Sequence, residues 1–68
     1  HKMNAPAALL ETLANWFDAE ITDTEDGYEV AGWAFYMEAD GLEVVTPAGK
    51  TVSLQVAELD QFFQFHLA

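Results

Sequence analysis

Two stretches of the chain place apolar residues at the three- and four-residue spacing of an α-helix. The first begins after Asn4 or Ala5, either of which can cap a helix that has Pro6 in its first turn, and it should end between Asp18 and Glu20. The second covers residues 56–67. Each stripe predicts one helix face packed against a core. The stripes are Leu9, Leu10, Leu13, Trp16 and Phe17 in the first helix, and Val56, Leu59, Phe62, Phe63 and Leu67 in the second.

The segment between the helices has the residue types and turns of an antiparallel sheet. β-branched, aromatic and small residues fill positions 28–37, 42–46 and 51–54, after a polar loop at 22–27. Asp40-Gly41 favours a two-residue hairpin turn. Pro47-Ala48-Gly49 favours a three-residue turn with Gly49 in the left-handed conformation. These turns predict three consecutive antiparallel strands.

The two turns imply strand registers that agree with each other. The first turn pairs Phe35 with Thr46, Met37 with Val44 and Glu38 with Glu43, and the second pairs Leu42 with Leu54 and Val44 with Val52. Both registers put one apolar set on the same face, and a one-residue slip would scatter that set. Its members are Trp33, Phe35, Met37, Leu42, Val44, Val52 and Leu54.

Only the start of the first strand breaks this alternation, because Tyr28 and Val30 are out of phase with Trp33. A β-bulge near Gly32 would restore the phase. The expected fold is therefore α+β with the order α-β-β-β-α. It is a three-stranded antiparallel meander with two helices packed on one face.

Charge is the most unusual property of the composition. The 68 residues include twelve Asp or Glu and two Lys, for a formal net charge of −10. His1 and Lys2 precede Met3, and we expect them to be an expression-tag remnant. Residues 3–68 are then a single compact acidic domain whose one basic residue is Lys50. With 51% hydrophobic and 13% aromatic residues, the chain is expected to fold despite its charge.

This composition excludes several classes of function. With so few cations, we expect no direct binding to nucleic acid or to an anionic membrane. No stretch has the roughly 18 apolar residues of a membrane span. No signal peptide is recognisable either, so a cytoplasmic location is expected. Cysteine is absent, which removes disulfides and thiolate metal sites.

The chain offers little for catalysis. Ser53 is the only serine, and it lies in an expected strand without a glycine elbow around it. His66 lies near the end of the second helix, where the helix dipole accounts for it. No Gly-rich phosphate loop or metal-binding His pair occurs. We therefore expect no enzyme activity and no cofactor.

The acidic loop raises the question of a calcium site, because hard cations prefer oxygen ligands. Six acids lie between residues 18 and 29. When Gly27 is aligned with the invariant glycine of an EF-hand, Thr22 falls at the first ligand position and Trp33 at the last. The last position requires a bidentate Glu. A specific metal site is therefore not expected.

The acids are expected instead to form a binding surface. In the register above, Glu38 and Glu43 face each other, which destabilises a sheet, and Glu11 and Asp18 extend the charge along the exposed side of the first helix. Solubility, the simpler alternative, needs a net charge of only about 2–8 in magnitude. The expected partner-binding residues are Asp23, Glu25, Asp26, Glu29, Glu38, Asp40 and Glu43, together with Tyr36.

Tyr36 belongs to this set because strand alternation places it on the sheet face away from the helices. Its expected neighbours there are Ala34, Val45 and Thr51. A half-apolar open face is a candidate contact surface. An ordinary solvated face of an antiparallel sheet is the alternative.

A dense negative surface complements a Lys/Arg-lined groove that holds DNA, since duplex DNA carries about one charge per 1.7 Å. In size, charge, lack of arginine and α+β build, the chain resembles the small acidic DNA-mimic inhibitors of bacteriophages, and most of all the anti-CRISPR proteins. The resemblance implies a non-enzymatic monomer or weak homodimer that binds a CRISPR effector complex in a bacterial host cell and blocks its target DNA. The alternative is a small acidic interaction module, antitoxin-like or immunity-like, or an inhibitor of another DNA-processing enzyme.

The expected element order is also that of the double-stranded-RNA-binding domain. That family needs a basic patch at the start of its second helix. The corresponding residues 55–60 carry Glu58 and Asp60 instead. A shared topology would therefore not imply a shared function.

Overall fold

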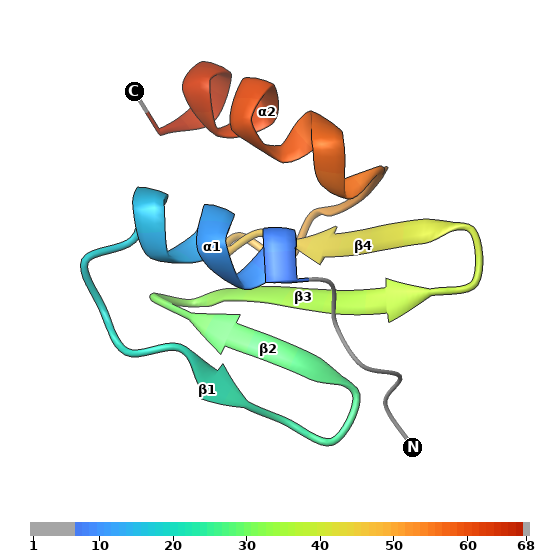
Figure 1. Ribbon diagram of the computed structural model, residues 1–68, viewed down its shortest axis with the longest axis horizontal. Helices are drawn as coiled ribbons and strands as arrows, with labels where there is room; N and C mark the ends of the chain where they lie inside the picture. The colour runs from blue at the N-terminus through green and yellow to red at the C-terminus, as the bar shows by residue number, and fades with distance from the viewer. Residues whose placement is uncertain (1–6, 68) are drawn as a thin grey trace.

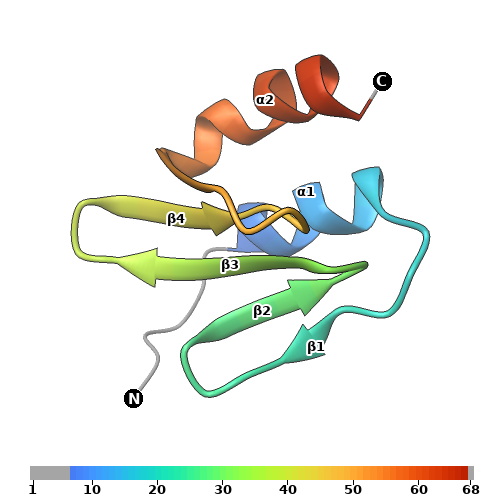
Figure 2. The same cartoon turned by 180° about the vertical axis from the view of Figure 1, so that it is seen from behind.

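Two helices lie on one face of a five-stranded antiparallel sheet (Figures 1 and 2). The computed structural model describes residues 7–67, so the expected cap at residues 4–6 lies outside the described residues. The elements are α1 (Ala7–Trp16), β1 (Thr22–Asp23), β2 (Gly27–Val30), β3 (Trp33–Glu38), β4 (Gly41–Val45), β5 (Thr51–Leu54), the 3₁₀ turn η1 (Val56–Glu58) and α2 (Leu59–His66). The α+β class is confirmed.

The strands follow one another in the sheet in the order β1-β2-β3-β4-β5, each antiparallel to the next. The expected three-stranded layout was therefore wrong. The polar loop at 22–27 contains the short strand β1, and the expected strand at 28–37 is a hairpin. The double-stranded-RNA-binding order is excluded by the same finding, because it has three strands between its helices.

The hairpin between β2 and β3 turns at Ala31 and Gly32, whose φ angles are 52° and 88°. Two consecutive positive φ values are those of a type I′ turn, which matches the twist of the flanking strands. Val30 then lies opposite Trp33. No bulge is needed near Gly32, because a tight turn brings Val30 onto the same face as Trp33.

The hairpin between β3 and β4 has a different register from the expected one. Met37 pairs with Leu42, and Glu38 pairs with Gly41, so the turn residues are Ala39 and Asp40. The pairing is offset by two positions, and an even offset leaves every side chain on its expected face. Phe35 accordingly pairs with Val44 rather than with Thr46.

Gly41 explains why the turn does not lie at residues 40–41. A Cβ on Gly41 would lie 2.8 Å from the carbonyl oxygen of Leu54 and 2.9 Å from the Gln55 side chain, and its φ is 150°. The side-chain amide nitrogen of Gln55, Nε2, also donates a hydrogen bond to the Asp40 carbonyl oxygen, at 2.7 Å. The glycine is thus required by contact with the end of β5, and not by a type I′ turn.

The second expected turn is confirmed in detail. Val44 pairs with Val52, and Leu42 with Leu54. The Thr46 amide donates to the Lys50 carbonyl oxygen at 2.8 Å, and Gly49 has a φ of 90°. Pro47, Ala48 and Gly49 therefore form the three-residue loop that their sequence favours.

The core lies between the helices and the covered face of the sheet. Both helices contribute fully buried residues to it, as do β3 and β4. Phe17, Trp33, Phe35 and Phe63 form an aromatic group within it, with ring centroids 5.3–6.4 Å apart. The buried residues are Leu9, Leu13, Val30, Trp33, Phe35, Leu42, Val44, Leu59 and Phe63.

The helices begin and end close to the expected positions. α1 ends at Trp16, slightly before the expected range, and the Trp16 indole nitrogen donates to the Asp60 carboxylate of α2 at 2.8 Å. The second helical segment opens with η1, where the Gln55 amide donates to the Glu58 carboxylate at 2.7 Å. Leu67, expected on the apolar stripe, is 39% exposed. Within residues 7–67, no helix has the length and apolar character required to cross a membrane.

Candidate protein-binding face

The sheet face away from the helices, here called the open face, carries side chains from all five strands. Strand pairing defines its members, because residues opposite each other in a sheet point to the same side. Tyr36 pairs with Glu43 on β4 and with Gly27 on β2, while Ala34 pairs with Val45 and with Glu29. The remaining members are Thr22, Glu38, Gly41, Thr51 and Ser53.

Tyr36 lies near the middle of the open face and is surrounded by carboxylates. Glu43 lies directly across from it, at a Cβ separation of about 4.5–5.5 Å for such pairs. Glu38 lies two residues further along β3, and Glu29 is diagonal to Tyr36 on β2. Tyr36 and Glu43 are half-buried, and Glu29 and Glu38 are exposed. The expected position of Tyr36 on this face is confirmed.

Glu38 and Glu43 are neighbours, but they do not face each other. Glu38 lies opposite Gly41, so Glu43 is its diagonal neighbour, and such positions are about 7–8 Å apart. The predicted direct like-charge pair was wrong for this reason. The repulsion between the two carboxylates is therefore weaker than the expected register implies, although both lie on the open face.

Further acids lie in the two turns at one end of the sheet. Glu25 and Asp26 form the tip between β1 and β2, and Asp40 lies in the turn between β3 and β4. Figure 1 shows both turns at the same end of the sheet. The first turn is closed by Thr24, whose amide donates to the Gly27 carbonyl oxygen at 2.9 Å and whose hydroxyl accepts from the Gly27 amide at 3.0 Å. These two hydrogen bonds fix the ends of the turn that carries Glu25 and Asp26.

Not all of the expected acids join this surface. Asp23 pairs with Tyr28, which packs against the core, so Asp23 lies on the covered side of the edge strand β1. Glu11 is exposed on α1, and Asp18 lies in the connection after that helix. The name acidic surface is used below for the six acids that the fold brings to the open face and its adjoining turns. They are Glu25, Asp26, Glu29, Glu38, Asp40 and Glu43.

Lys50 lies at the opposite end of the sheet from the two acidic turns. It follows the loop between β4 and β5, close to where the Ala31-Gly32 turn packs, since a Cβ on Gly32 would lie 3.5 Å from Pro47. Lys50 is the only Lys or Arg in residues 7–67. The acidic surface therefore contains no lysine or arginine to neutralise it.

The carboxylates of the acidic surface are spread out and do not form a compact ligand set. Within residues 7–67, no group of three His, Asp or Glu side chains is arranged to hold a metal ion. The six carboxylates are spread over three strands and two turns. Such spacing suits a row of cationic side chains on a partner, each of which contacts one or two carboxylates.

One group of side chains was not identified from the sequence. Trp33, Lys50, Val52, Phe62 and His66 line a pocket at the end of the sheet away from the acidic turns. Lys50 and His66 are the only residues of basic type between 7 and 67, and both belong to this pocket. The two residues are far apart in the sequence, so no local pattern predicts that they lie together. The one signal in the sequence is that basic residues are rare in this chain.

Searches of protein-family models, of curated proteins and of solved structures gave no match to this chain.

Proposed function

We propose that this chain is a non-enzymatic inhibitor that presents the acidic surface to the DNA-binding groove of a basic protein. A CRISPR effector complex is the partner that we propose, which makes the chain an anti-CRISPR protein acting in the cytoplasm of a bacterial host. The observation that carries the proposal is the gathering of six carboxylates on the open face and its adjoining turns, without a lysine or arginine among them.

The geometry of a sheet supports imitation of a phosphate backbone. The open face carries one carboxylate on each of three neighbouring strands, Glu29 on β2, Glu38 on β3 and Glu43 on β4. Diagonal neighbours such as Glu38 and Glu43 are about 7–8 Å apart. Duplex DNA also presents closely spaced negative charges, about one per 1.7 Å of helix axis, and a Lys/Arg-lined groove can contact carboxylates placed in this way.

Tyr36 adds a specific contact to this electrostatic attraction. Tyr36 is half-buried and lies directly across from Glu43 and diagonal to Glu29 on the open face. A guanidinium group stacks on an aromatic ring and also forms paired hydrogen bonds to a carboxylate. An arginine of the partner can therefore contact Tyr36 and Glu43 together.

The test measures inhibition of DNA binding by purified CRISPR effector complexes of several types. The working variant is the triple change Glu38→Lys, Asp40→Lys and Glu43→Lys. We expect the unmodified chain to compete with target DNA, and the triple variant to lose at least tenfold in potency, about 1.4 kcal/mol. Inhibition should also weaken as salt is raised, because screening reduces attraction between surface charges.

A second triple variant makes the test specific to position. Glu11→Lys, Asp18→Lys and Glu20→Lys change the net charge by the same amount, at exposed positions outside the acidic surface. We expect this control to keep most of the potency. Equal loss in both variants would contradict the proposed surface, and it would indicate an effect of net charge alone.

The partner is tested separately with the same reagents. Nucleases and DNA glycosylases that lack a guide RNA are assayed in parallel with the effector complexes. Inhibition of one of these enzymes and of no effector complex would overturn the anti-CRISPR assignment while retaining DNA mimicry. Absence of inhibition in every assay would overturn both.

A further inference from the structure

The pocket that contains Lys50 and His66 lies on the covered side of the sheet, beyond the turn of the β4–β5 hairpin. Its volume is about 380 Å³. Small-molecule sites in proteins span about 300–1,000 Å³. The pocket therefore has room for one ring system with a short side chain, and it is too small for a dinucleotide.

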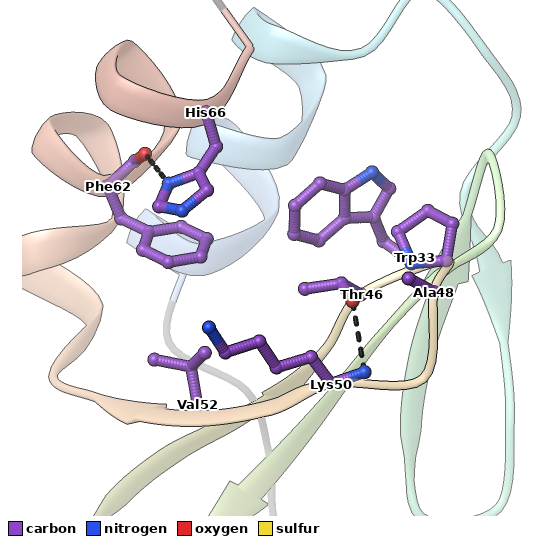
Figure 3. A pocket seen from close by; sticks show the side chains of 8 residues that line it. Trp33, Thr46, Ala48, Lys50, Val52, Phe62 and His66 are labelled. Atoms are coloured by element: carbon purple, nitrogen blue, oxygen red, sulfur yellow. Dashed lines mark hydrogen bonds between the residues drawn. The ribbon is translucent and has the colours of Figure 1, made fainter.

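The floor of the pocket is aromatic and aliphatic. Trp33 and Phe62 meet there edge to face, with ring centroids 6.1 Å apart, and Val52 of β5 lies beside them. Figure 3 shows these side chains converging from α2 and from the sheet. Trp33 is 7% exposed, so its ring is fixed by the core behind it. A planar apolar ligand would thus meet a rigid surface.

Lys50 gives this apolar pocket a positive charge. In Figure 3 its side chain extends back from the loop, and its amino group ends below Phe62 and beside Val52. The Lys50 backbone is held by a hydrogen bond from its amide to the Thr46 hydroxyl at 3.1 Å. An ammonium group next to an apolar surface favours a ligand that has a negative group adjoining a ring.

His66 supplies the second polar atom. Its ring stacks on Phe62 with centroids 4.2 Å apart, and its Nδ1 lies 3.0 Å from the Phe62 carbonyl oxygen. A carbonyl oxygen only accepts hydrogen bonds, so Nδ1 carries the proton and donates. In the neutral ring Nε2 is then an acceptor. Figure 3 shows Nε2 on the side of the ring away from this hydrogen bond, where it can accept from a ligand N–H.

The two acidic turns oppose an anion only weakly at this position, because they lie at the far end of the sheet. The strand β3 separates the two ends of the sheet by about 17 Å from Trp33 to Glu38, at 3.4 Å per residue. The Debye length at physiological ionic strength is about 8 Å. The connection between α1 and β1, which contains Asp18 and Glu20, passes this end of the sheet (Figure 1), but neither residue lines the pocket.

We propose that this pocket binds a small aromatic carboxylate whose ring carries an N–H, such as an indole acid. The ring packs on Trp33, Val52 and Phe62, the carboxylate accepts from the Lys50 ammonium group, and the ring N–H donates to His66 Nε2. The site is separate from the acidic surface, and its existence does not depend on the function proposed above.

The test compares indole-3-acetate with its neutral isostere indole-3-acetamide, at about 0.15 M salt. Binding is followed by NMR through the backbone amide signals of residues 46–52 and 62–66. We expect saturable binding of indole-3-acetate with a dissociation constant of about 1 mM or tighter. The amide should bind at least tenfold more weakly.

Two variants at Lys50 isolate the role of its charge. Lys50→Gln should abolish the preference for the acid, and Lys50→Arg should retain it. Equal affinity of the unmodified chain for the two ligands would overturn the proposal. An undiminished preference in Lys50→Gln, or no saturable binding at about 10 mM ligand, would do the same.

A variant at His66 tests the ring N–H. His66→Phe keeps an aromatic ring on Phe62 and removes the acceptor. We expect it to weaken indole-3-acetate by about threefold to tenfold, the effect of one neutral hydrogen bond, and to leave 1-naphthylacetate, which lacks an N–H, unchanged. Equal changes for the two ligands would overturn the assignment of Nε2.

Discussion

The two faces of the sheet are built from alternate residues of the same strands, yet they differ in almost every property. Phe35 is fully buried on the covered face, and the next residue, Tyr36, is half-buried on the open face. The covered face holds only apolar side chains in its core, and no buried residue is polar or charged among residues 7–67. The open face holds three carboxylates. One face thus supplies the folding free energy, which leaves the other free to carry repelling charges.

The largest effect should come from the covered face. Phe63→Ala removes a fully buried ring that packs against Trp16, Phe17, Trp33 and Phe35. We expect a loss of about 3–5 kcal/mol in the free energy of unfolding, measured by urea denaturation. For a chain of this size, that loss is comparable to the whole stability.

Phe65→Ala is the matched control on the same helix, because Phe65 is 90% exposed. Its effect on stability should stay within about 0.5 kcal/mol. Similar losses for the two variants would contradict the assignment of the core to one side of α2.

The next effect tests the contact between β2 and β3, two neighbouring strands that each contribute side chains to both faces of the sheet. A Cβ on Gly27 would lie 1.9 Å from the Phe35 carbonyl oxygen, so Gly27→Ala forces the strands apart. We expect a loss of about 2–3 kcal/mol, measured by thermal denaturation. Gly49→Ala meets no atom within 4 Å and changes only a positive φ. It should cost about 1 kcal/mol, and a cost equal to that of Gly27→Ala would refute the close approach.

A smaller effect of opposite sign is expected on the open face. Combining Glu38→Gln with Glu43→Gln removes two diagonal like charges. We expect a gain of about 0.5–1 kcal/mol at low salt, falling as salt is raised. The control is Glu11→Gln, which lies on α1 away from this group and should change stability less. A loss of stability in the double variant would show that these carboxylates do not repel.

The smallest effect concerns the turn that sets β2 in phase with β3. Ala31 has a φ of 52°, a conformation that Asn adopts more readily than Ala. We expect Ala31→Asn to stabilise the protein by about 0.5 kcal/mol, measured as a rise in melting temperature. Ala39 occupies the other two-residue turn without a positive φ. Ala39→Asn should give no gain, and equal gains would contradict the type I′ assignment.

The alternation of side chains could be predicted from the sequence, whereas two of the turns could not. Every residue expected on the covered face lies there, because an even register offset preserves the faces. The Ala31-Gly32 turn was missed because alanine is unusual at a left-handed position. The turn at Asp40-Gly41 was misplaced because its glycine serves a contact with Gln55, fifteen residues away from Asp40. Such a contact leaves no local pattern in the sequence.

The candidate sites show the same division between local and distant relations. Tyr36 could be placed on the open face from strand alternation alone. The direct pairing of Glu38 with Glu43 was predicted wrongly because the turn between their strands was misplaced. The side of the sheet on which Asp23 lies could not be predicted, because the edge strand β1 was not expected. Lys50 and His66 lie together in the pocket because α2 folds back over the sheet after β5. Strand alternation gives no information about that packing.

The sequential order of the five strands has a consequence for how fast the protein folds. Each strand pairs only with its neighbour in the chain, so every hairpin closes a short loop. Most contacts between distant parts of the chain come from the two helices, which pack on the sheet, as Phe63 does on Phe35, and on each other, as Trp16 does with Asp60. Folding rates rise as contacts become more local. We therefore expect the sheet to assemble in milliseconds or faster, with the docking of the two terminal helices as the slowest step.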